Sequence, residues 1–343
     1  MNTPIITFFN TKGGVGKTTL VSNLAWMYSN LGLRVIAADL DPQANLSMVF
    51  LGEDRLEELW LEGQQRKTIF ASVLPLLQGL DDISDPHLEF VEDQLALLAG
   101  DIALFKLENE LAQWWSTCLD TYNPKQEFAF RMISAFWRIM QRAARLHQAN
   151  IILMDLAPTL GAINRAALIA ADYIAVPLTL DLFALHSLPN LGVTLQDWRQ
   201  QWQERLAKKN PEIALELPLA KMQPIGYVVL QHSVRFDRPV KTYQNWLARI
   251  PEVYQEAIWN NSGDGAISIA NDPNCLAILK NYHSLMSMAQ VAQKPIFQLK
   301  PADGIIGAHS AAVKSAYQDF EALARKIAER TDVEMSLTPS TNL

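Results

Sequence analysis

Short apolar runs alternate along the chain with longer segments in which apolar residues recur every three or four positions. The short runs are almost continuously apolar, as expected for parallel strands that are covered on both faces. They occupy residues 4–9, 34–39, 95–100, 151–155, 173–178 and 225–230. The longer, helical segments occupy residues 17–31, 101–115, 128–147, 162–171, 185–205 and 310–330. This alternation predicts an α/β fold with a doubly wound, mainly parallel sheet flanked by helices on both faces.

The same pattern predicts one domain over residues 1–330 and a flexible polar tail over 331–343. Residues 52–148 form a partly irregular, partly helical insert region, and residues 52–94 are its least regular part. The tryptophans of the insert region are expected to fill a core rather than to bind a ligand; they are Trp114, Trp115 and Trp137.

Composition excludes several classes of protein. The chain has 343 residues, 49% of them hydrophobic, and no run of eighteen apolar residues, so we expect a globular protein without a membrane anchor. The N-terminus lacks a basic segment followed by an apolar one, which favours a cytoplasmic location. Cys118 and Cys275 stand far apart without clustered histidines, which favours buried reduced thiols. The net charge of −7 argues against a surface that binds nucleic acid everywhere, although a local basic patch remains possible.

The stretch "FFNTKGGVGKTTL" (8–20) follows the first predicted strand and opens the first predicted helix. Phosphates bind at this place in such sheets, because glycine lets successive backbone N–H groups surround phosphate oxygens and the helix N-terminus is partially positive. Lys17 is expected to reach the β- and γ-phosphates, the Thr18 hydroxyl to ligate Mg²⁺, and Thr19 to contact the α-phosphate. The predicted nucleotide-binding residues are Lys12, Gly13, Gly14, Val15, Gly16, Lys17, Thr18 and Thr19.

Three motifs carry a resemblance to a known family. The general P-loop pattern would require a glycine where Thr11 stands, but "KGGVGKT" with Lys12 resembles the deviant Walker A motif of the ParA/MinD/Soj ATPases. "VIAADLDPQANLS" (35–47) is similar to the family's "DxDPQxN" segment. "IILMDLAPTLGAINRAAL" (151–168) is similar to its Walker B segment, "IIIDxPPxxG", with Ala157 in place of the first proline. The motifs follow the family's order, and the resemblance is closest to the ParA/Soj partition branch.

The resemblance implies an ATPase that uses ATP and Mg²⁺ and acts as a slow molecular switch. Asp155 ends an apolar strand and is the expected outer ligand of Mg²⁺, since a charge there without a partner would be costly. Asp41 is expected to orient the attacking water, and Asp39 to support the magnesium shell. A local turn or cap role stays open for either aspartate. The catalytic set is therefore Lys12, Lys17 and Asp41, and the metal set is Thr18, Asp39 and Asp155.

Lys12 matches the family's signature lysine, which reaches phosphates bound by a second subunit across a two-fold axis. The resemblance therefore implies a homodimer in the ATP state, released when a ParB-like or other cargo protein stimulates hydrolysis. MinD-like members end in a basic amphipathic helix, whereas the tail here lacks lysine, arginine and large aromatic residues, so membrane docking through it is disfavoured.

ParA/Soj-like members bind DNA non-specifically, which would associate this chain with the nucleoid. The candidate contacts are Arg235, Arg238, Lys241 and Arg249. The stretch that contains these residues is explained about as well as a solvent-exposed helix face whose aromatic residues are buried. Leu285 replaces an arginine that family members often carry, so any DNA binding must depend on other residues.

Two other classes of protein are alternatives to the switch. A metabolic amidoligase or synthetase with a similar P-loop needs its own acids and bases in a substrate pocket, and no such cluster is evident in the sequence. An electron-transfer ATPase with an iron–sulfur cluster needs paired cysteines among glycines, which Cys118 and Cys275 do not provide.

Overall fold

The computed structural model describes residues 2–61, 66–230, 240–260, 267–282 and 284–335. The described residues form one eight-stranded sheet in the order β3-β4-β2-β5-β1-β6-β7-β8. All neighbouring strands are parallel except the edge pair β3–β4, which is antiparallel. The strands are β1 (Ile5–Phe8), β2 (Val35–Asp39), β3 (Glu89–Glu92), β4 (Leu95–Leu98), β5 (Ile151–Asp155), β6 (Tyr173–Thr179), β7 (Gln223–Leu230) and β8 (Cys275–Leu279). The predicted fold class is confirmed.

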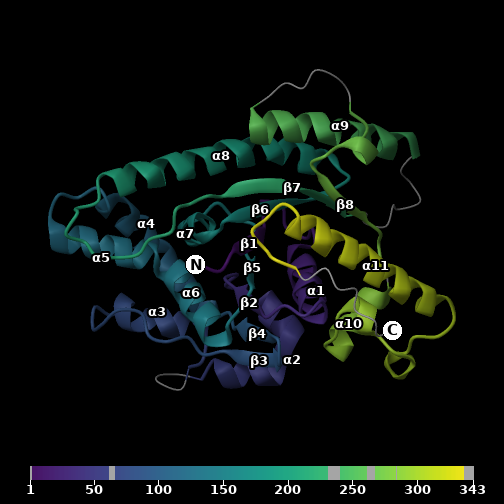
Figure 1. Ribbon diagram of the computed structural model, residues 1–343, viewed down its shortest axis with the longest axis horizontal. Helices are drawn as coiled ribbons and strands as arrows, with labels where there is room; N and C mark the ends of the chain where they lie inside the picture. The colour runs from purple at the N-terminus through teal and green to yellow at the C-terminus, as the bar shows by residue number, and fades with distance from the viewer. Residues whose placement is uncertain (1, 62–65, 231–239, 261–266, 283, 336–343) are drawn as a thin grey trace.

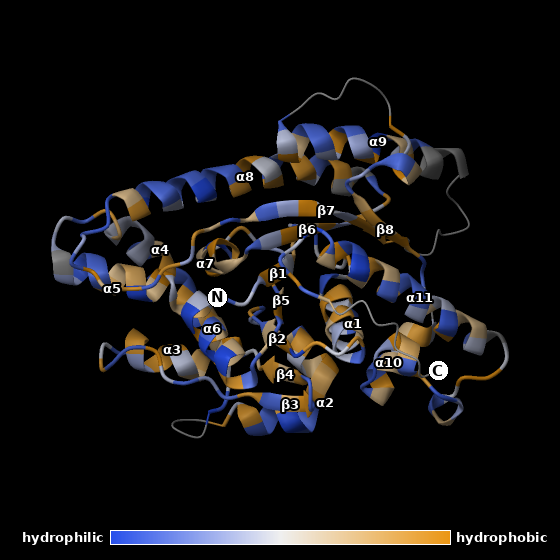
Figure 2. Ribbon diagram, in the orientation of Figure 1, coloured by the Kyte–Doolittle hydropathy of each residue, from blue (hydrophilic) through white to orange (hydrophobic). Residues whose placement is uncertain are grey.

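Helices cover both faces of this sheet (Figure 1). One apolar core contains residues of α3 (Ile69–Leu77), α4 (Leu107–Thr117), α5 (Asn123–Ile133), α6 (Ala135–His147), α7 (Ala162–Ala170), α8 (Leu182–Ala207) and α9 (Val240–Trp259). The other contains residues of α1 (Lys17–Asn30), α2 (Asn45–Leu59), α10 (Ser284–Ala292) and α11 (Ala308–Ala328). Short 3-10 helices are η2 (Ile102–Lys106), η3 (Ile269–Asn271), η4 (Ile296–Gln298) and η5 (Pro301–Asp303). The surface helices α8 and α11 carry both hydrophilic and hydrophobic residues along their length, as one-sided burial requires (Figure 2).

All six predicted strands are present, but two edge strands were missed. β3 alternates between half-buried and exposed residues, and β8 is five residues long with two of them outside the core. The region 52–94, predicted to be irregular, contains the end of α2, the whole of α3 and β3. These elements are joined by described stretches without helix or strand at 66–68 and 78–88.

The predicted helix over 128–147 is two helices, with the break at Ser134. The Ser134 hydroxyl donates to the backbone oxygen of Phe130 at 2.6 Å and accepts from Arg138 Nε at 3.2 Å. Serine side chains that bond to the preceding turn in this way bend helices. Trp115 and Trp137 lie in the core as expected, and Trp114 packs edge-on against Phe128.

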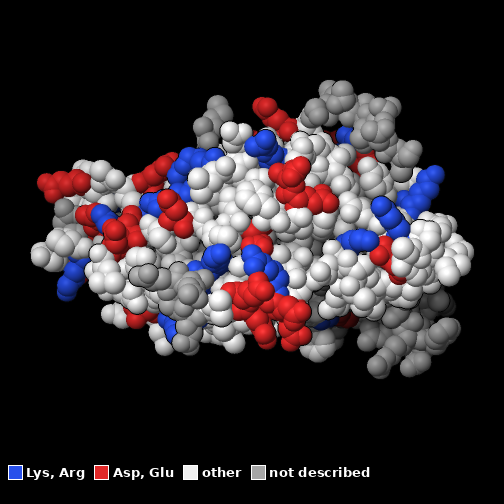
Figure 3. Space-filling view, turned by 90° about the horizontal axis from the view of Figure 1, so that it is seen from below, with Lys and Arg blue, Asp and Glu red and all other residues white. Residues whose placement is uncertain are grey.

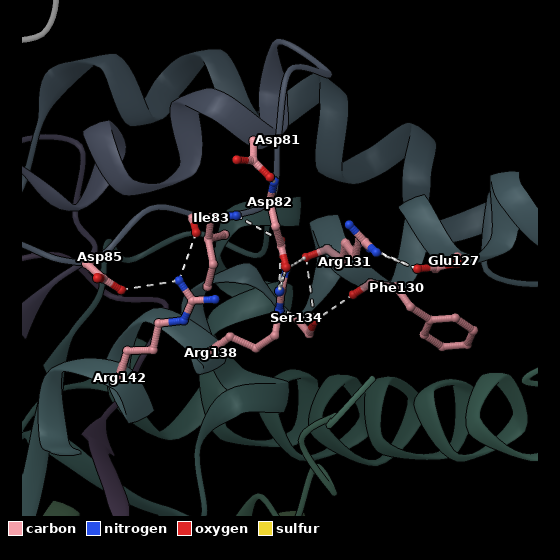
Figure 4. Close-up of polar contacts among 10 residues, drawn as sticks. All are labelled: Asp81, Asp82, Ile83, Asp85, Glu127, Phe130, Arg131, Ser134, Arg138 and Arg142. Carbon is pink, nitrogen blue, oxygen red and sulfur yellow. Dashed lines mark hydrogen bonds and ion pairs between the residues drawn. The ribbon is translucent and has the colours of Figure 1, made fainter. Parts of the chain in front are cut away.

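Two arginines of α6 hold the segment before β3 (Figure 4). Arg138 donates to both oxygens of Asp82 at 2.8 and 2.6 Å, and Arg142 donates to the backbone oxygen of Ile83 at 2.8 Å. Partial burial opposes ionisation of Asp82, but the hydrogen bonds from Arg138 and from the Ile83 N–H outweigh it and lower the pKa of Asp82. The segment is thereby fixed against the helix layer that supports β4.

Candidate nucleotide site

The glycine-rich loop runs from the end of β1 to the start of α1, at the carboxyl edge of the sheet. Gly14 and Gly16 have φ angles of 70° and 83°, which side-chain-bearing residues rarely adopt. A Cβ at Gly16 would also lie 2.9 Å from a methyl group of Leu230 on β7. The turn that exposes the loop's N–H groups therefore requires glycine at both positions.

Lys17 lies folded back under this loop. Its Nζ donates to the backbone oxygens of Asn10 and Lys12, each at 3.2 Å, and the residue is 7% exposed. Burial lowers the pKa of Lys17, while the nearby carboxylates of Asp155 and Asp41 oppose that shift. The ammonium group is thus held at the centre of the loop by carbonyl groups that a phosphate could replace or supplement.

The aspartates of the second and third motifs meet on neighbouring strands. Asp39 of β2 is the register partner of Asp155 of β5, and both are completely buried. Asp155 accepts a hydrogen bond from the Thr18 hydroxyl at 2.7 Å, and its Oδ1 is buried without a hydrogen-bond partner among the described residues. An unpartnered carboxylate oxygen beside a threonine hydroxyl is the donor set that Mg²⁺ takes beside phosphate oxygens. These residues therefore fit a magnesium ion held together with phosphate oxygens.

Burial raises the pKa of both carboxyls, and the charge of a neighbouring aspartate adds to it: Asp155 for Asp39, and Asp41 for Asp155. For Asp39, burial has the largest effect and the charge of Asp155 adds to it. For Asp155, burial again dominates, and the Thr18 hydroxyl and Lys17 only partly oppose it. A divalent cation would remove both penalties, because it stabilises the ionised carboxylates.

Asp39 and Asp41 differ in what they contact. The two oxygens of Asp39 accept from the Ser47 N–H and hydroxyl, both at 2.8 Å, and from the Asp41 N–H at 3.2 Å. Asp41 accepts from the Gln43 N–H at 2.9 Å and lines the cavity described below. Both aspartates thus make the local turn contacts that the sequence left open, and of the two only Asp41 also faces the cavity.

A cavity of about 700 Å³ lies over the loop, in the size range of small-molecule sites. Its lining includes Gly13, Gly14, Gly16, Lys17, Thr18, Thr19, Asp41, Leu156 and Pro158, together with residues of α1, α2, α10 and the segment 293–296. Most of the predicted loop residues are therefore brought together around one hollow, while Val15 is buried behind it.

The Lys12 side chain contacts the end of β6 and is not part of the cavity lining. Its Nζ donates to Thr179 Oγ1 at 2.9 Å and forms an ion pair with Asp181, both at the end of β6. Its side chain is 30% exposed. The predicted signature lysine is therefore held by its own chain here, at the rim of the loop.

Several residues of the site were missed from the sequence. Asn10 is fully buried, accepts from the Lys12 N–H at 3.1 Å and donates to the Pro177 oxygen at 2.8 Å, joining the loop to β6. The Ser47 hydroxyl accepts from the Gly100 N–H at 2.8 Å and so joins Asp39 to the end of β4. Of these, Ser47 could have been suggested by its place in the second motif, but α10 carried no signal, because no local pattern shows which helix covers a cavity.

Most of the candidate DNA-binding residues lie outside the residues that the structure describes. Arg235 and Arg238 lie outside the described residues, as does the side chain of Lys241. Arg249 is exposed on α9, with its guanidinium 5.8 Å from the ring centre of Trp246. No helix in the described ranges is long and apolar enough to cross a membrane.

A family model described as an AAA domain matches residues 3–208, more than half of the chain. The chain belongs to the ParA/Soj/MinD family of P-loop ATPases. It is 29% identical over 191 residues to the cell division protein PomZ of Myxococcus xanthus, covering 55% of this chain and 50% of PomZ. It is 29% identical over 202 residues to the chromosome partitioning protein ParA of Caulobacter vibrioides, covering 59% of this chain and 66% of ParA. The match thus spans between half and two thirds of these relatives.

A solved structure shares the fold across nearly the whole chain. It is a plasmid partition protein from Borrelia burgdorferi B31 bound to AMPPNP, with a TM-score of 0.55 and 17% identity, covering 96% of this chain and 100% of that one. The likeness supports the fold. Beyond the family match, β7, β8, α9, α10 and α11 belong to the same sheet and helix layers.

Proposed function

We propose that this chain binds ATP with Mg²⁺, hydrolyses it slowly, and acts as a dimeric switch of the ParA type. The observation that carries the proposal is the contact of Thr18 with Asp155 beside the glycine loop, with the second Asp155 oxygen unpartnered among the described residues. The loop N–H groups and Lys17 would bind the β- and γ-phosphates, Thr19 would contact the α-phosphate, and Thr18 and Asp155 would hold Mg²⁺. Bound Mg²⁺ neutralises charge on the phosphate oxygens.

Asp41 is the proposed water-orienting carboxylate. It lines the cavity and lies two residues beyond β2, the strand that pairs with β5 and Asp155. Asp39, with its oxygens engaged by Ser47 and Asp41, would support the Asp41 loop and the magnesium shell from behind. Loss of Asp41 would therefore slow ATP hydrolysis far more than it would weaken ATP binding.

We expect Asp41→Ala to bind ATP with an affinity close to that of the wild type and to hydrolyse it ~10²-fold more slowly, as loss of a positioned catalytic group requires. Calorimetry would give the affinity, and phosphate release in single-turnover experiments would give the rate. Gln43→Ala is the matched control, because Gln43 lines the same cavity and contacts Asp41 only through its backbone N–H. Unchanged turnover in Asp41→Ala would transfer the role to another residue.

Binding of the magnesium nucleotide is expected to release protons at neutral pH. Asp39 and Asp155 have raised pKa values in the free protein, so they hold protons below those values. A bound cation lowers both, so release should occur between the lowered and the raised values and vanish at higher pH, where both groups are already ionised. Titrations with Mg-AMPPNP in two buffers of different ionisation enthalpy measure the release. Equal release by AMPPNP with a chelator would contradict this account.

Lys12 supports the dimeric part of the proposal. Its side chain is 30% exposed and is held by Thr179 and Asp181 at the end of β6. If a second subunit presented its phosphates there, Lys12 would exchange the Asp181 carboxylate for a phosphate. ATP would thus hold two subunits face to face, and hydrolysis would release them.

We further propose that the ATP-bound dimer binds DNA non-specifically, and that a ParB-like or other cargo protein stimulates hydrolysis. PomZ and ParA, named for cell division and chromosome partitioning, support a positioning role. The face seen from below in Figure 3 gathers acidic side chains near α2, where Glu53, Asp54, Glu57 and Glu58 are exposed. This acidic cluster would repel DNA, although Lys and Arg side chains are scattered over the rest of the same face (Figure 3). A DNA surface is therefore expected away from α2, with Arg249 of α9 as its described candidate.

A further inference from the structure

The Walker B segment ends at Gly161, a glycine for which phosphate and metal binding give no reason. Gly161 is the N-cap of α7, with φ −80° and ψ 178°, angles that any residue adopts. It has no side chain to cap the helix. The first N–H groups of α7 are instead satisfied from another helix: Glu108 of α4 accepts from Ala162 N at 2.5 Å and from Ile163 N at 3.1 Å.

Glycine at 161 leaves room for this contact, and the backbone angles themselves do not call for glycine. A Cβ there would lie 2.6 Å from Glu108 Oε1 and 2.9 Å from Oε2, far closer than carbon and oxygen approach without a bond. Any larger residue would push the carboxylate away from the helix end. Gly161 and Glu108 therefore act together to cap α7, although 53 positions separate them in the chain.

This cap by Glu108 fixes one end of the loop that follows Asp155. The Asn164 amide, one turn into α7, donates to the backbone oxygens of Ala157 at 2.6 Å and Thr159 at 2.7 Å. Leu156 and Pro158 of this loop line the nucleotide cavity, and the Pro158 ring comes within 3.8 Å of the Cβ position of Gly13. The loop is thus held by β5 at one end and by α7 at the other.

We propose that Glu108 is a positioning residue for hydrolysis, acting through α7 on the loop 156–161 and on Asp155. This inference rests on the proposed function. A carboxylate at a helix N-terminus satisfies orphan N–H groups and the helix dipole together, so its loss releases the end of α7. The phosphate contacts of the glycine loop do not pass through α7. ATP affinity should therefore persist while the geometry around Mg²⁺ and the attacking water is lost.

The test is a double-mutant cycle measured by single-turnover ATP hydrolysis and ATP calorimetry. Glu108→Ala and Gly161→Ala should each lower the rate roughly tenfold to a hundredfold, the scale of an ångström-sized misplacement, with the ATP Kd within about twofold of wild type. Glu108→Gln keeps one acceptor oxygen and should recover part of the rate. In the double variant, Gly161→Ala should cost almost nothing further, because the new methyl group then meets no carboxylate. Glu110→Ala, on the same helix and bonded only to Trp114 among the contacts described, is the matched control.

Each contrary outcome is distinct. Wild-type rates in Glu108→Ala and Glu108→Gln, with only a lower melting temperature, would mean that Glu108 caps α7 without positioning anything for catalysis. Additive losses in the double variant would refute the steric link between residues 161 and 108. Weakened ATP binding with an unchanged rate would also overturn the inference. A wild-type protein that fails to hydrolyse ATP would instead refute the proposed function, and this inference with it.

Discussion

Lys17→Ala is expected to abolish ATP binding. The Lys17 ammonium lies beneath the glycine loop, bonded to the oxygens of Asn10 and Lys12, where a phosphate would meet it. Two hydrogen bonds to a charged phosphate contribute about 1.5–3 kcal/mol each, which corresponds to roughly 10²–10⁴-fold in affinity. Calorimetric titration with ATP and Mg²⁺ measures the loss.

Lys125→Ala is the control for this experiment, since Lys125 is exposed on α5, far from the loop in sequence. Circular dichroism must show that Lys17→Ala is folded, because the substitution also removes a buried cation that interacts with Asp155 and Asp41. A folded variant that binds ATP as the wild type does would remove the P-loop assignment.

The second large effect concerns assembly. Asp41→Ala in ATP should accumulate as a dimer, because it binds nucleotide without consuming it. Adding Lys12→Ala should return it to monomer while nucleotide binding persists, because the Lys12 side chain contacts Thr179 and Asp181 and is not part of the cavity lining. Light scattering coupled to size exclusion measures the mass, with Lys125→Ala again as the control. A dimer that forms equally well without nucleotide would contradict the switch.

In the same samples, DNA binding is expected only where the dimer forms. On a chain of net charge −7, a local basic patch gains strength when two copies are paired. The Asp41→Ala dimer should retard non-specific duplex DNA, steeply less so with added salt, and charge reversal at Arg235 and Arg238 should abolish retention without dissociating it. If the dimer does not bind DNA at low salt, the surface that it binds is expected to be a protein or a membrane instead.

The six continuous apolar strands were predictable because parallel strands buried on both faces leave an unbroken apolar signal. The edge strands β3 and β8 have one exposed side, and their shorter or alternating patterns resemble loops. Likewise, Ser134 divides a helix that periodicity alone reads as continuous, because the break is made by contacts of one side chain.

By itself the sequence determined the fold class and the chemistry of the phosphate loop. Glycines at positive φ, a lysine and a threonine at the end of a first strand are local requirements, and they are written at fixed spacing. Only the tertiary structure decided which side chains meet. The register of β2 with β5 sets Asp39 beside Asp155, and the end of β6 brings Thr179 and Asp181 to Lys12. The packing of α4 against α7 explains the glycine at position 161, because the carboxylate of Glu108, 53 positions away, occupies the space that a side chain would fill. Such contacts depend on how strands and helices pack in three dimensions, and no spacing along the chain records them.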